Sequence, residues 1–274
     1  MHMFKSALMA TLASFILSYS VQATSLSNNV KLKQAIASDQ RSSAHKARDK
    51  YRHPLATLTF FGLTPNMTVV EMIPGGGWYT EILAATLKGS GTFYAANYPD
   101  TGKDDYYSKT RRDLVNKFSN NSLFSEVKIS DFNPKKVSAI APQASADLVL
   151  TFRNLHNWGE AGMTQFFKDA YTALKPNGVL GVVEHRMPAA MKYQQHSRSG
   201  YVPQALVIKL AKQAGFKLVA TSEINANPKD DAMHPAGVWT LPPVFQLGDK
   251  DHAKYLAIGE SDRMTLKFVK PVMQ

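Results

Sequence analysis

Two hydrophobic periods alternate along residues 57–270, and each predicts a different kind of element. Short apolar runs such as Asp147–Phe152 are typical of strands that are buried on both faces of a sheet. Stretches with apolar residues three and four positions apart, such as Met163–Leu174, are typical of amphipathic helices. Strands that alternate with helices predict right-handed crossovers, and hence an α/β fold with a doubly wound, mostly parallel sheet.

The pattern predicts about seven strands with helices between them. The expected strands are Thr68–Ile73, Thr92–Ala96, Leu123–Ile129, Asp147–Phe152, Val179–Glu184, Phe216–Ser222 and Met264–Val269. The expected helices are Leu55–Phe61, Trp78–Leu87, Asp104–Phe118, Met163–Leu174 and Pro203–Ala214. The stretch from Asn225 to Asp262 has few element signals and many Pro, Gly and Asp residues. We expect it to be functional or packed over a site, as long irregular stretches in compact domains usually are.

The first 23 residues have the features of a secretory signal peptide. Lys5 gives a positive start, Ala7–Leu17 is apolar, and Val21-Gln22-Ala23 has small residues where a signal peptidase cleaves. A membrane anchor is disfavoured because a spanning helix needs about 20 apolar residues. We therefore expect a periplasmic or secreted protein with no transmembrane segment after cleavage. A helical cover over residues 24–64 should precede the main domain at residues 65–274.

The chain is basic and lacks cysteine. The 274 residues carry a formal net charge of +11, which favours acidic partners or surfaces. The basic residues are spread along the chain and form none of the common nucleic-acid motifs, so no nucleic-acid partner is expected. A basic protein that binds an anionic polymer through its surface is one alternative reading.

The stretch from Val69 to Thr80, VVEMIPGGGWYT, predicts a strand, a glycine-rich turn and a helix. Glu71 lies near the end of the strand, where open α/β sheets bind their ligands. Gly75, Gly76 and Gly77 allow positive φ and let a ligand lie against bare peptide groups. The stretch therefore predicts a small-ligand site.

The glycine spacing argues against two common nucleotide sites. A dinucleotide fingerprint needs G-x-G-x-x-G and an acid about 20 residues further on. Here the glycines are consecutive, and the first acid after the second predicted strand is Asp100. No Gly-Lys-Ser/Thr follows either, so neither NAD nor a P-loop phosphate is expected.

Several segments share their order with one enzyme family. They are Glu71–Gly77, Asn97, Asp131-Phe132, Asp147–His156 and Leu174–Leu180. In this order they make the chain from Thr57 to Lys270 resemble the class I S-adenosylmethionine-dependent methyltransferases. The resemblance implies a Rossmann-like sheet, mostly parallel with an antiparallel last strand. It also implies S-adenosylmethionine as the cofactor.

The resemblance assigns the cofactor contacts residue by residue. Glu71 and the backbone of Gly75, Gly76 and Gly77 would face the methionine end, over which Tyr79 could close. Asn97 would lie at the ribose, and Asp131 and Phe132 would flank the adenine. Arg153 and Asn154 would make the contact that follows the fourth strand.

A closer likeness is to a group of exported, predicted methyltransferases. The segments that carry it are PGGGWYTEIL, which begins at Pro74, and GESDRMTL, Gly259 to Leu266. It agrees with the predicted signal peptide. We expect the acceptor to be a small molecule or a component of the cell envelope, and the sequence does not identify it. No oligomeric state is predicted.

Two histidines are candidate catalytic bases. His156 follows a buried strand at its carboxyl end and could take a proton from a hydroxyl or amine of the acceptor. His185, after the fifth strand, is the second candidate. The C-terminal group Glu223, Asp230, Asp231, His234 and His252 matches no common zinc spacing, so no metal is expected.

Two departures from the family pattern keep a second function open. Ile73 replaces the first glycine of the turn, and Asn97 replaces the usual acid at the ribose. A carboxylate accepts both ribose hydroxyls better than an amide does. The alternative is a non-catalytic protein that binds a small ligand on a methyltransferase scaffold.

Overall fold

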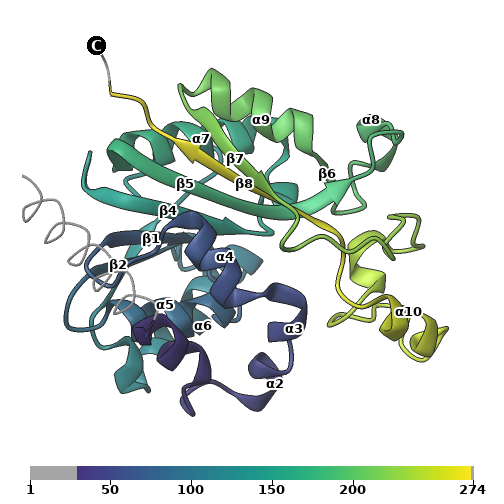
Figure 1. The fold of residues 1–274 in the computed structure, drawn as a ribbon, viewed down its shortest axis with the longest axis horizontal. Coiled ribbons are helices and arrows are strands. Elements are labelled where there is room, and N and C mark those ends of the chain that lie inside the picture. The colour runs from purple at the N-terminus through teal and green to yellow at the C-terminus, as the bar shows by residue number, and fades with distance from the viewer. Residues whose placement is uncertain (1–29, 273–274) are drawn as a thin grey trace, which may run out of the picture.

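An eight-stranded sheet forms the centre of the molecule in the computed structural model, which describes residues 30–272 (Figure 1). The strands are β1 (Thr68–Met72), β2 (Thr92–Asn97), β3 (Val127–Asp131), β4 (Ala146–Phe152), β5 (Leu174–Met187), β6 (Val202–Pro203), β7 (Lys217–Ser222) and β8 (Arg263–Val269). Their order is β3-β2-β1-β4-β5-β8-β7, and the short β6 pairs with β5. The predicted signal peptide lies outside the described residues, among which no helix is long and apolar enough to cross a membrane.

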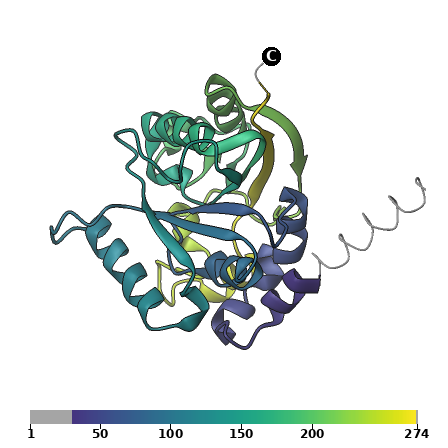
Figure 2. The same cartoon turned by 90° about the vertical axis from the view of Figure 1, so that its left-hand side faces the viewer.

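Helices cover both faces of this sheet (Figures 1 and 2). The longer ones are α4 (Pro54–Phe61), α5 (Trp78–Leu87), α6 (Tyr106–Ser119), α7 (Gly159–Ala173) and α9 (Gln204–Gln213). The shorter ones are α2 (Ser43–Lys46), α3 (Asp49–Arg52), α8 (Tyr193–His196) and α10 (His252–Ile258). Three 3₁₀ turns are η1 (Ser122–Phe124), η2 (Leu155–Asn157) and η3 (Gly237–Thr240), and residues 30–37 are also helical.

The alternation of side chains along each strand creates two apolar cores. Leu148 and Leu150 face the core shared with α4 and α5, whereas Val149 between them faces the core shared with α7 and α9. All three side chains are fully buried. A strand that is buried on both faces explains why β4 reads as a continuous apolar run.

The strand directions confirm the predicted fold class. The pairs of β1 with β2 and β4, of β2 with β3, and of β4 with β5 are parallel. β8 runs antiparallel to both β5 and β7, as the resemblance implied. The mostly parallel, Rossmann-like sheet therefore has an antiparallel strand inserted near one edge.

The predicted starts of two strands are wrong: β5 begins at Leu174 instead of Val179, and β3 begins later than predicted. Leu123 does not begin β3; it lies in η1, whose first turn is held by the Asn121 side chain accepting a hydrogen bond from the Leu123 N–H. Leu123 and Phe124 are buried in the same core as α5 and α6. Their apolar character serves this packing, and β3 starts at Val127.

Two segments that are distant in sequence come together at the carboxyl ends of the parallel strands, on the right of Figure 1. One contains α3 and the other precedes β8. Glu260 joins them by accepting hydrogen bonds from Arg48 and Arg52. Asn225 makes a second connection by donating to Thr57 of α4 and to Thr265 of β8.

The boundary at residue 64 between a separate cover and a main domain stays a prediction.

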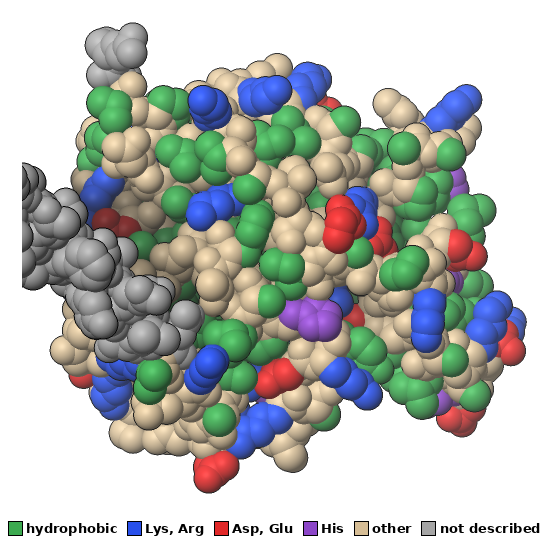
Figure 3. Space-filling view, viewed as in Figure 1, with side chains coloured by type: hydrophobic (Ala, Val, Ile, Leu, Met, Phe, Trp, Pro, Cys, Tyr) green, Lys and Arg blue, Asp and Glu red, His purple; other side chains and the backbone are tan. Residues whose placement is uncertain are grey.

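Charged side chains are dispersed over the surface. On the face drawn in Figure 3, Lys and Arg side chains are separated by polar, apolar and acidic ones and form no continuous patch. This distribution agrees with a solvated basic surface and gives no particular support to binding of an anionic polymer.

Candidate functional site

The glycine-rich loop follows β1 and leads into α5. Gly75 and Gly77 adopt left-handed backbone conformations, with φ of 59° and 83°. No other group lies within 4 Å of the place where a Cβ of Gly75 or Gly76 would sit. Both residues are exposed, so their backbone is open to a ligand.

Neighbouring β1 and β4 both end in a non-glycine residue with positive φ. Ile73 follows β1 with a φ of 42°, and Arg153 follows β4 with a φ of 60°. Hydrogen bonds from the N–H of Ile73 to the Ala96 carbonyl and from the N–H of Arg153 to the Val183 carbonyl hold these turns. Such strained positions cluster at functional sites, where surrounding structure holds them in place.

Glu71 is a buried carboxyl group beside this loop. One of its oxygens accepts a hydrogen bond of 2.6 Å from the Thr80 hydroxyl, in the first turn of α5. No described residue donates to the other oxygen. Burial raises the pKa of Glu71 to about 7, although Thr80, Lys117 and Arg153 act in the opposite direction. The carboxyl group therefore titrates near neutral pH and has one acceptor free.

Asn154 ties the ends of β1 and β4 together. Its Nδ2 donates to the Met72 carbonyl at 2.8 Å and to the Thr151 hydroxyl at 3.3 Å. The Arg153 side chain has no hydrogen-bond partner among the described residues, and its Nη1 is buried. Asn154 therefore shapes the edge of the sheet, and Arg153 keeps its donors available.

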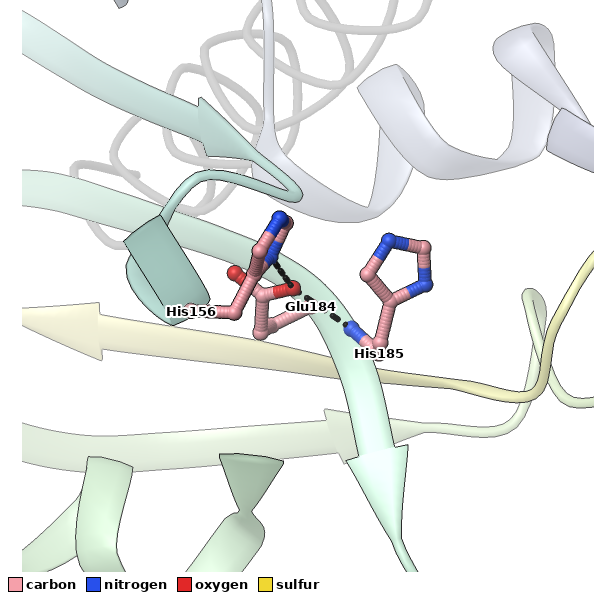
Figure 4. Close-up of side chains that lie close together, drawn as sticks. All are labelled: His156, Glu184 and His185. Atoms are coloured by element: carbon pink, nitrogen blue, oxygen red, sulfur yellow. Dashed lines mark hydrogen bonds and ion pairs between the residues drawn. The ribbon is translucent and has the colours of Figure 1, made fainter. Parts of the chain in front are cut away.

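His156, Glu184 and His185 form one cluster, although they come from η2 and β5 (Figure 4). Glu184 Oε1 lies 3.1 Å from His156 Nδ1, and Oε2 accepts a 2.6 Å hydrogen bond from the Leu155 N–H. An ionised carboxylate can only accept, so His156 Nδ1 carries the proton and its Nε2 keeps a lone pair. This arrangement suits a proton acceptor.

His185 lies 5.2 Å from His156 between ring centroids, and both rings project to the same side of β5 (Figure 4). Its Nδ1 forms a hydrogen bond with the Ser261 hydroxyl. Burial, followed by the charges of His156 and Arg153, holds the pKa of His185 well below its ordinary value of 6.5. His185 is therefore neutral near pH 7.

The residues expected at the adenosine end are engaged in other contacts. Asn97 is fully buried, and its amide donates to the Thr110 carbonyl and accepts from the Tyr98 N–H. The Phe132 ring is buried in the core against Trp158. Asp131 is exposed and forms an ion pair with Arg111. The cofactor roles of these three residues stay predictions.

A cavity lies beside these residues, between the loops that follow β2 and β3. Its volume is about 320 Å³, and Tyr98, Pro99, Tyr107, Asn133 and Pro134 are among the residues that line it. The Tyr98 hydroxyl accepts a hydrogen bond of 2.9 Å from the Trp158 indole. No local sequence pattern identifies Tyr98 as a site residue, because a single tyrosine after a strand is common.

Tyr79 is buried under the N-terminal helices. Its ring stacks on Phe152 with centroids 3.5 Å apart, and its hydroxyl donates to the Arg52 carbonyl. In this conformation it contributes to packing behind the site, and its predicted closure over a ligand is untested.

The sequence missed an arginine cluster. Glu260 accepts hydrogen bonds from Arg48, Arg52 and Arg263 at 2.7, 3.2 and 3.1 Å. Burial alone would raise the pKa of Glu260, but Arg52, Arg263, Arg153 and Arg48 lower it to about 2. The only signal was GESDR, which contains Glu260 and Arg263; the partners from α3 lie more than 200 positions away.

The C-terminal acids and histidines do not form one group. Asp230 lies near His234 and Asp231, and its carboxylate accepts from Tyr201 and two backbone N–H groups. Glu223 pairs instead with Arg186, and His252 stacks on Phe245. These partners are sufficient to explain the residues structurally.

No protein-family model and no curated protein matches the sequence. The structure, however, is similar to solved S-adenosylmethionine-dependent methyltransferases. One from Aquifex aeolicus has a TM-score of 0.53 and 15% identity, over 82% of this chain and 93% of that chain. The chain has the Rossmann-like fold of these methyltransferases.

Two further structures agree with this fold. A methyltransferase from Methanosarcina mazei has a TM-score of 0.52 and 12% identity, over 79% of this chain and 97% of that chain. The [4+2]-cyclase SpnF has a TM-score of 0.56 and 15% identity, over 92% and 97%. At this level of identity, the similarity concerns the fold.

We call the side of the sheet where the parallel strands end its carboxyl edge. The residues there fit the methionine end of S-adenosylmethionine better than its adenosine end. The free oxygen of Glu71 can accept from an ammonium, and the open backbone of Gly75 and Gly76 lets an amino-acid moiety approach closely. The unpaired donors of Arg153 remain available to an anionic group. At the other end, Asn97 and Phe132 are engaged, and the cavity beside Tyr98 is the space that remains.

Proposed function

We propose that this protein transfers a methyl group from S-adenosylmethionine to an acceptor in the cell envelope. One observation carries the proposal. At the ligand-binding edge of a methyltransferase fold, Glu71 of β1 is followed by an open glycine loop. Beside them, His156, which follows β4, pairs with Glu184 of β5. This is the combination that cofactor binding and proton removal from an acceptor require.

The chain mainly binds and aligns its ligands. The cofactor supplies a methyl group on a positively charged sulfur, which an acceptor atom displaces directly. Glu71 would accept a hydrogen bond from the ammonium of the methionine moiety through its free oxygen, and the exposed backbone of Gly75 and Gly76 would let that moiety approach closely. Holding both reactants in line accounts for most of the rate enhancement that the protein must supply.

His156 removes the proton of the acceptor. Glu184 holds its Nδ1–H, so Nε2 accepts the proton as the new bond to carbon forms, and the resulting imidazolium is stabilised by the adjacent carboxylate. His185, which is neutral near pH 7, lies beside it, with ring centroids 5.2 Å apart.

The envelope location rests on the N-terminal sequence. An apolar run after Lys5 and small residues before Thr24 are those of an exported protein. The acceptor is then a small molecule or an envelope component that meets the enzyme outside the cytoplasm, and the cofactor must reach the same compartment.

A second candidate is a non-catalytic protein that binds a small ligand on this scaffold. The observation in its favour is the state of the adenosine end. Ile73 carries a side chain into the core at the tightest point of the turn, and Asn97 has both amide groups engaged. A ligand smaller than S-adenosylmethionine would avoid both obstacles.

Methyl-labelled S-adenosylmethionine and envelope extracts distinguish the two candidates. The mature chain from Thr24 is incubated with both, and label is followed into each fraction. We expect transfer that His156→Gln abolishes while S-adenosylhomocysteine still binds. Binding of S-adenosylhomocysteine without transfer to any fraction would favour the non-catalytic protein.

A further inference from the structure

The carboxyl edge of the sheet holds more positive charge than its acids neutralise. Arg48, Arg52 and Arg263 share the single carboxylate of Glu260. Glu260 and the side chains of Arg52 and Arg263 are at most 4% exposed. Uncompensated buried charge is costly, so such a cluster is retained where something anionic completes it.

Arg153 brings a fourth guanidinium to this cluster and has no partner of its own. Its Nη1 is buried without a hydrogen bond, and no described residue accepts from its other nitrogens. Arg153 follows β4, beside the end of β1 from which the glycine loop starts, and its charge also acts on Glu260 of the arginine cluster. An arginine presents paired donors that match a carboxylate or a phosphate.

The histidine cluster lies within the same electrostatic field. Arg153, Arg263 and Arg52 all disfavour a positive charge on His185. His156, Glu184 and His185 are close enough to hold a metal ion, but this field opposes a cation there. It favours an anion beside the proposed base.

The cofactor does not supply the missing negative charge. S-adenosylmethionine carries one carboxylate against an ammonium and a sulfonium, so its binding adds net positive charge to the site. Glu260, Glu184 and a titrating Glu71 together offset at most three of the four guanidinium charges. The remaining anion must come with another ligand.

We propose that the acceptor carries an anionic oxyacid group, a carboxylate or a phosphate, and that Arg153 and Arg52 bind this group beside His156. This inference rests on the proposed methyl transfer. It narrows the acceptor to an anionic molecule and makes Arg153 the residue that selects it. The bound anion would also hold the acceptor next to the proton-accepting Nε2.

Thermal unfolding with inorganic phosphate and with succinate, at constant ionic strength set by NaCl, tests the anion site. We expect a saturable rise in Tm for the mature chain, because a ligand that binds only the folded state stabilises it. Arg153→Met should weaken binding of at least one anion about tenfold or more, because it removes a charge-assisted contact. Arg198→Met, which changes an exposed arginine outside the cluster, should leave it unchanged.

Folding of the variants is controlled in the same experiment. Without anion, Arg153→Met should have a Tm at or above that of the wild type, since it removes an unpaired buried charge. Arg153→Lys keeps the positive charge but loses the paired, coplanar donors of the guanidinium group. It should therefore retain part of the rise in Tm that the anions cause.

The anion titrations are repeated with saturating S-adenosylhomocysteine and with saturating 5′-methylthioadenosine, which lacks the amino-acid moiety. They show whether the anion occupies the site of the acceptor or that of the cofactor carboxylate. Anion binding that persists with S-adenosylhomocysteine supports an anionic acceptor. If S-adenosylhomocysteine displaces the anion and 5′-methylthioadenosine does not, Arg153 binds the cofactor carboxylate. This result would overturn the inference and leave the methyl-transfer proposal standing.

The two proposals fail in different ways. If the anions bind but neither S-adenosylmethionine nor S-adenosylhomocysteine does, methyl transfer is wrong and the anion site remains, as that of another ligand. If no saturable anion effect is seen with the wild type, the inference is wrong whatever the cofactor does.

Discussion

Glu71 is 2% exposed, and its burial has a measurable consequence for stability. Its pKa is about 7 in the folded protein and 4.5 in the reference state. Between these pH values the unfolded chain loses the proton while the folded protein keeps it, so the free energy of unfolding falls as pH rises. Above pH 7 the cost is constant at about 3 kcal/mol.

Glu71→Gln should therefore stabilise the ligand-free protein at pH 8 and have little effect at pH 5. The amide keeps an acceptor for the Thr80 hydroxyl and carries no charge. Urea unfolding of both proteins at the two pH values measures the difference. An equal change at pH 5 and pH 8 would show that Glu71 does not titrate as described.

His156→Gln tests the role of one imidazole. We expect a loss of turnover of about 10²–10⁴-fold, the usual contribution of a positioned base, with unchanged binding of S-adenosylhomocysteine. His196→Gln, in the short helix α8, is the matched control and should retain full activity. Labelled methyl transfer to the acceptor fraction measures the turnover of each. Full activity of His156→Gln would remove it from the mechanism.

At the residue scale, the sequence predicted positions better than contacts. Arg153 and His156 were identified because hydrophobic periodicity locates the end of a strand, and strand ends line ligand sites. The pairing of His156 with Glu184, and the inward rotation of Asn97 onto Thr110, depend on neighbours that no local pattern encodes.

The element that fixes the carboxyl edge is α4, which lies against β5 and β8. A Cβ on Gly181 of β5 would lie 2.8 Å from the Phe61 ring and 2.7 Å from the Leu150 side chain. The close approach of α4 to the sheet therefore requires glycine at this position. Gly62, with a φ of 85°, ends the helix and turns the chain towards β1.

Gly181→Ala should lower the free energy of unfolding by about 1–3 kcal/mol, as overpacking of a core does. Gly76→Ala is the control: its φ is not positive and no other group lies within 4 Å of its Cβ position, so stability should not fall. Urea unfolding compares the two. Equal stability of both variants would mean that α4 shifts freely on the sheet.

Whole elements were the most predictable level of this structure. The order of strands and helices from Thr68 onward follows from alternating periods, and β8 was placed antiparallel by the resemblance. The Leu123–Phe124 pair was misassigned because a short buried 3₁₀ turn has the same apolar composition as a strand.

At the scale of the whole molecule, Glu260 connects the two ends of the described chain. It binds Arg48 and Arg52 near the N-terminal end, and Arg263 at the start of β8. These contacts span more than 200 residues, so no local sequence pattern predicts them. They place the arginine cluster at the edge of the sheet where the histidines lie.

Glu260→Gln should destabilise the protein by about 3–5 kcal/mol, because it leaves buried guanidinium groups without a carboxylate. Glu223→Gln removes an ion pair whose carboxylate is 68% exposed, and should cost less than about 1 kcal/mol. Urea unfolding at pH 7 separates the two. A small effect of Glu260→Gln would show that the arginines are screened by water.

The central claim is that the glycine loop holds the methionine end of S-adenosylmethionine. Calorimetric titration of S-adenosylhomocysteine into the mature wild type, Gly75→Ala and Gly89→Ala tests it most directly. Both glycines have positive φ and open space at the Cβ position, so the two variants should lose similar stability. We predict saturable binding to the wild type and Gly89→Ala, and binding at least about tenfold weaker to Gly75→Ala. Equal binding to all three proteins, or none to the wild type at millimolar ligand, would contradict the claim.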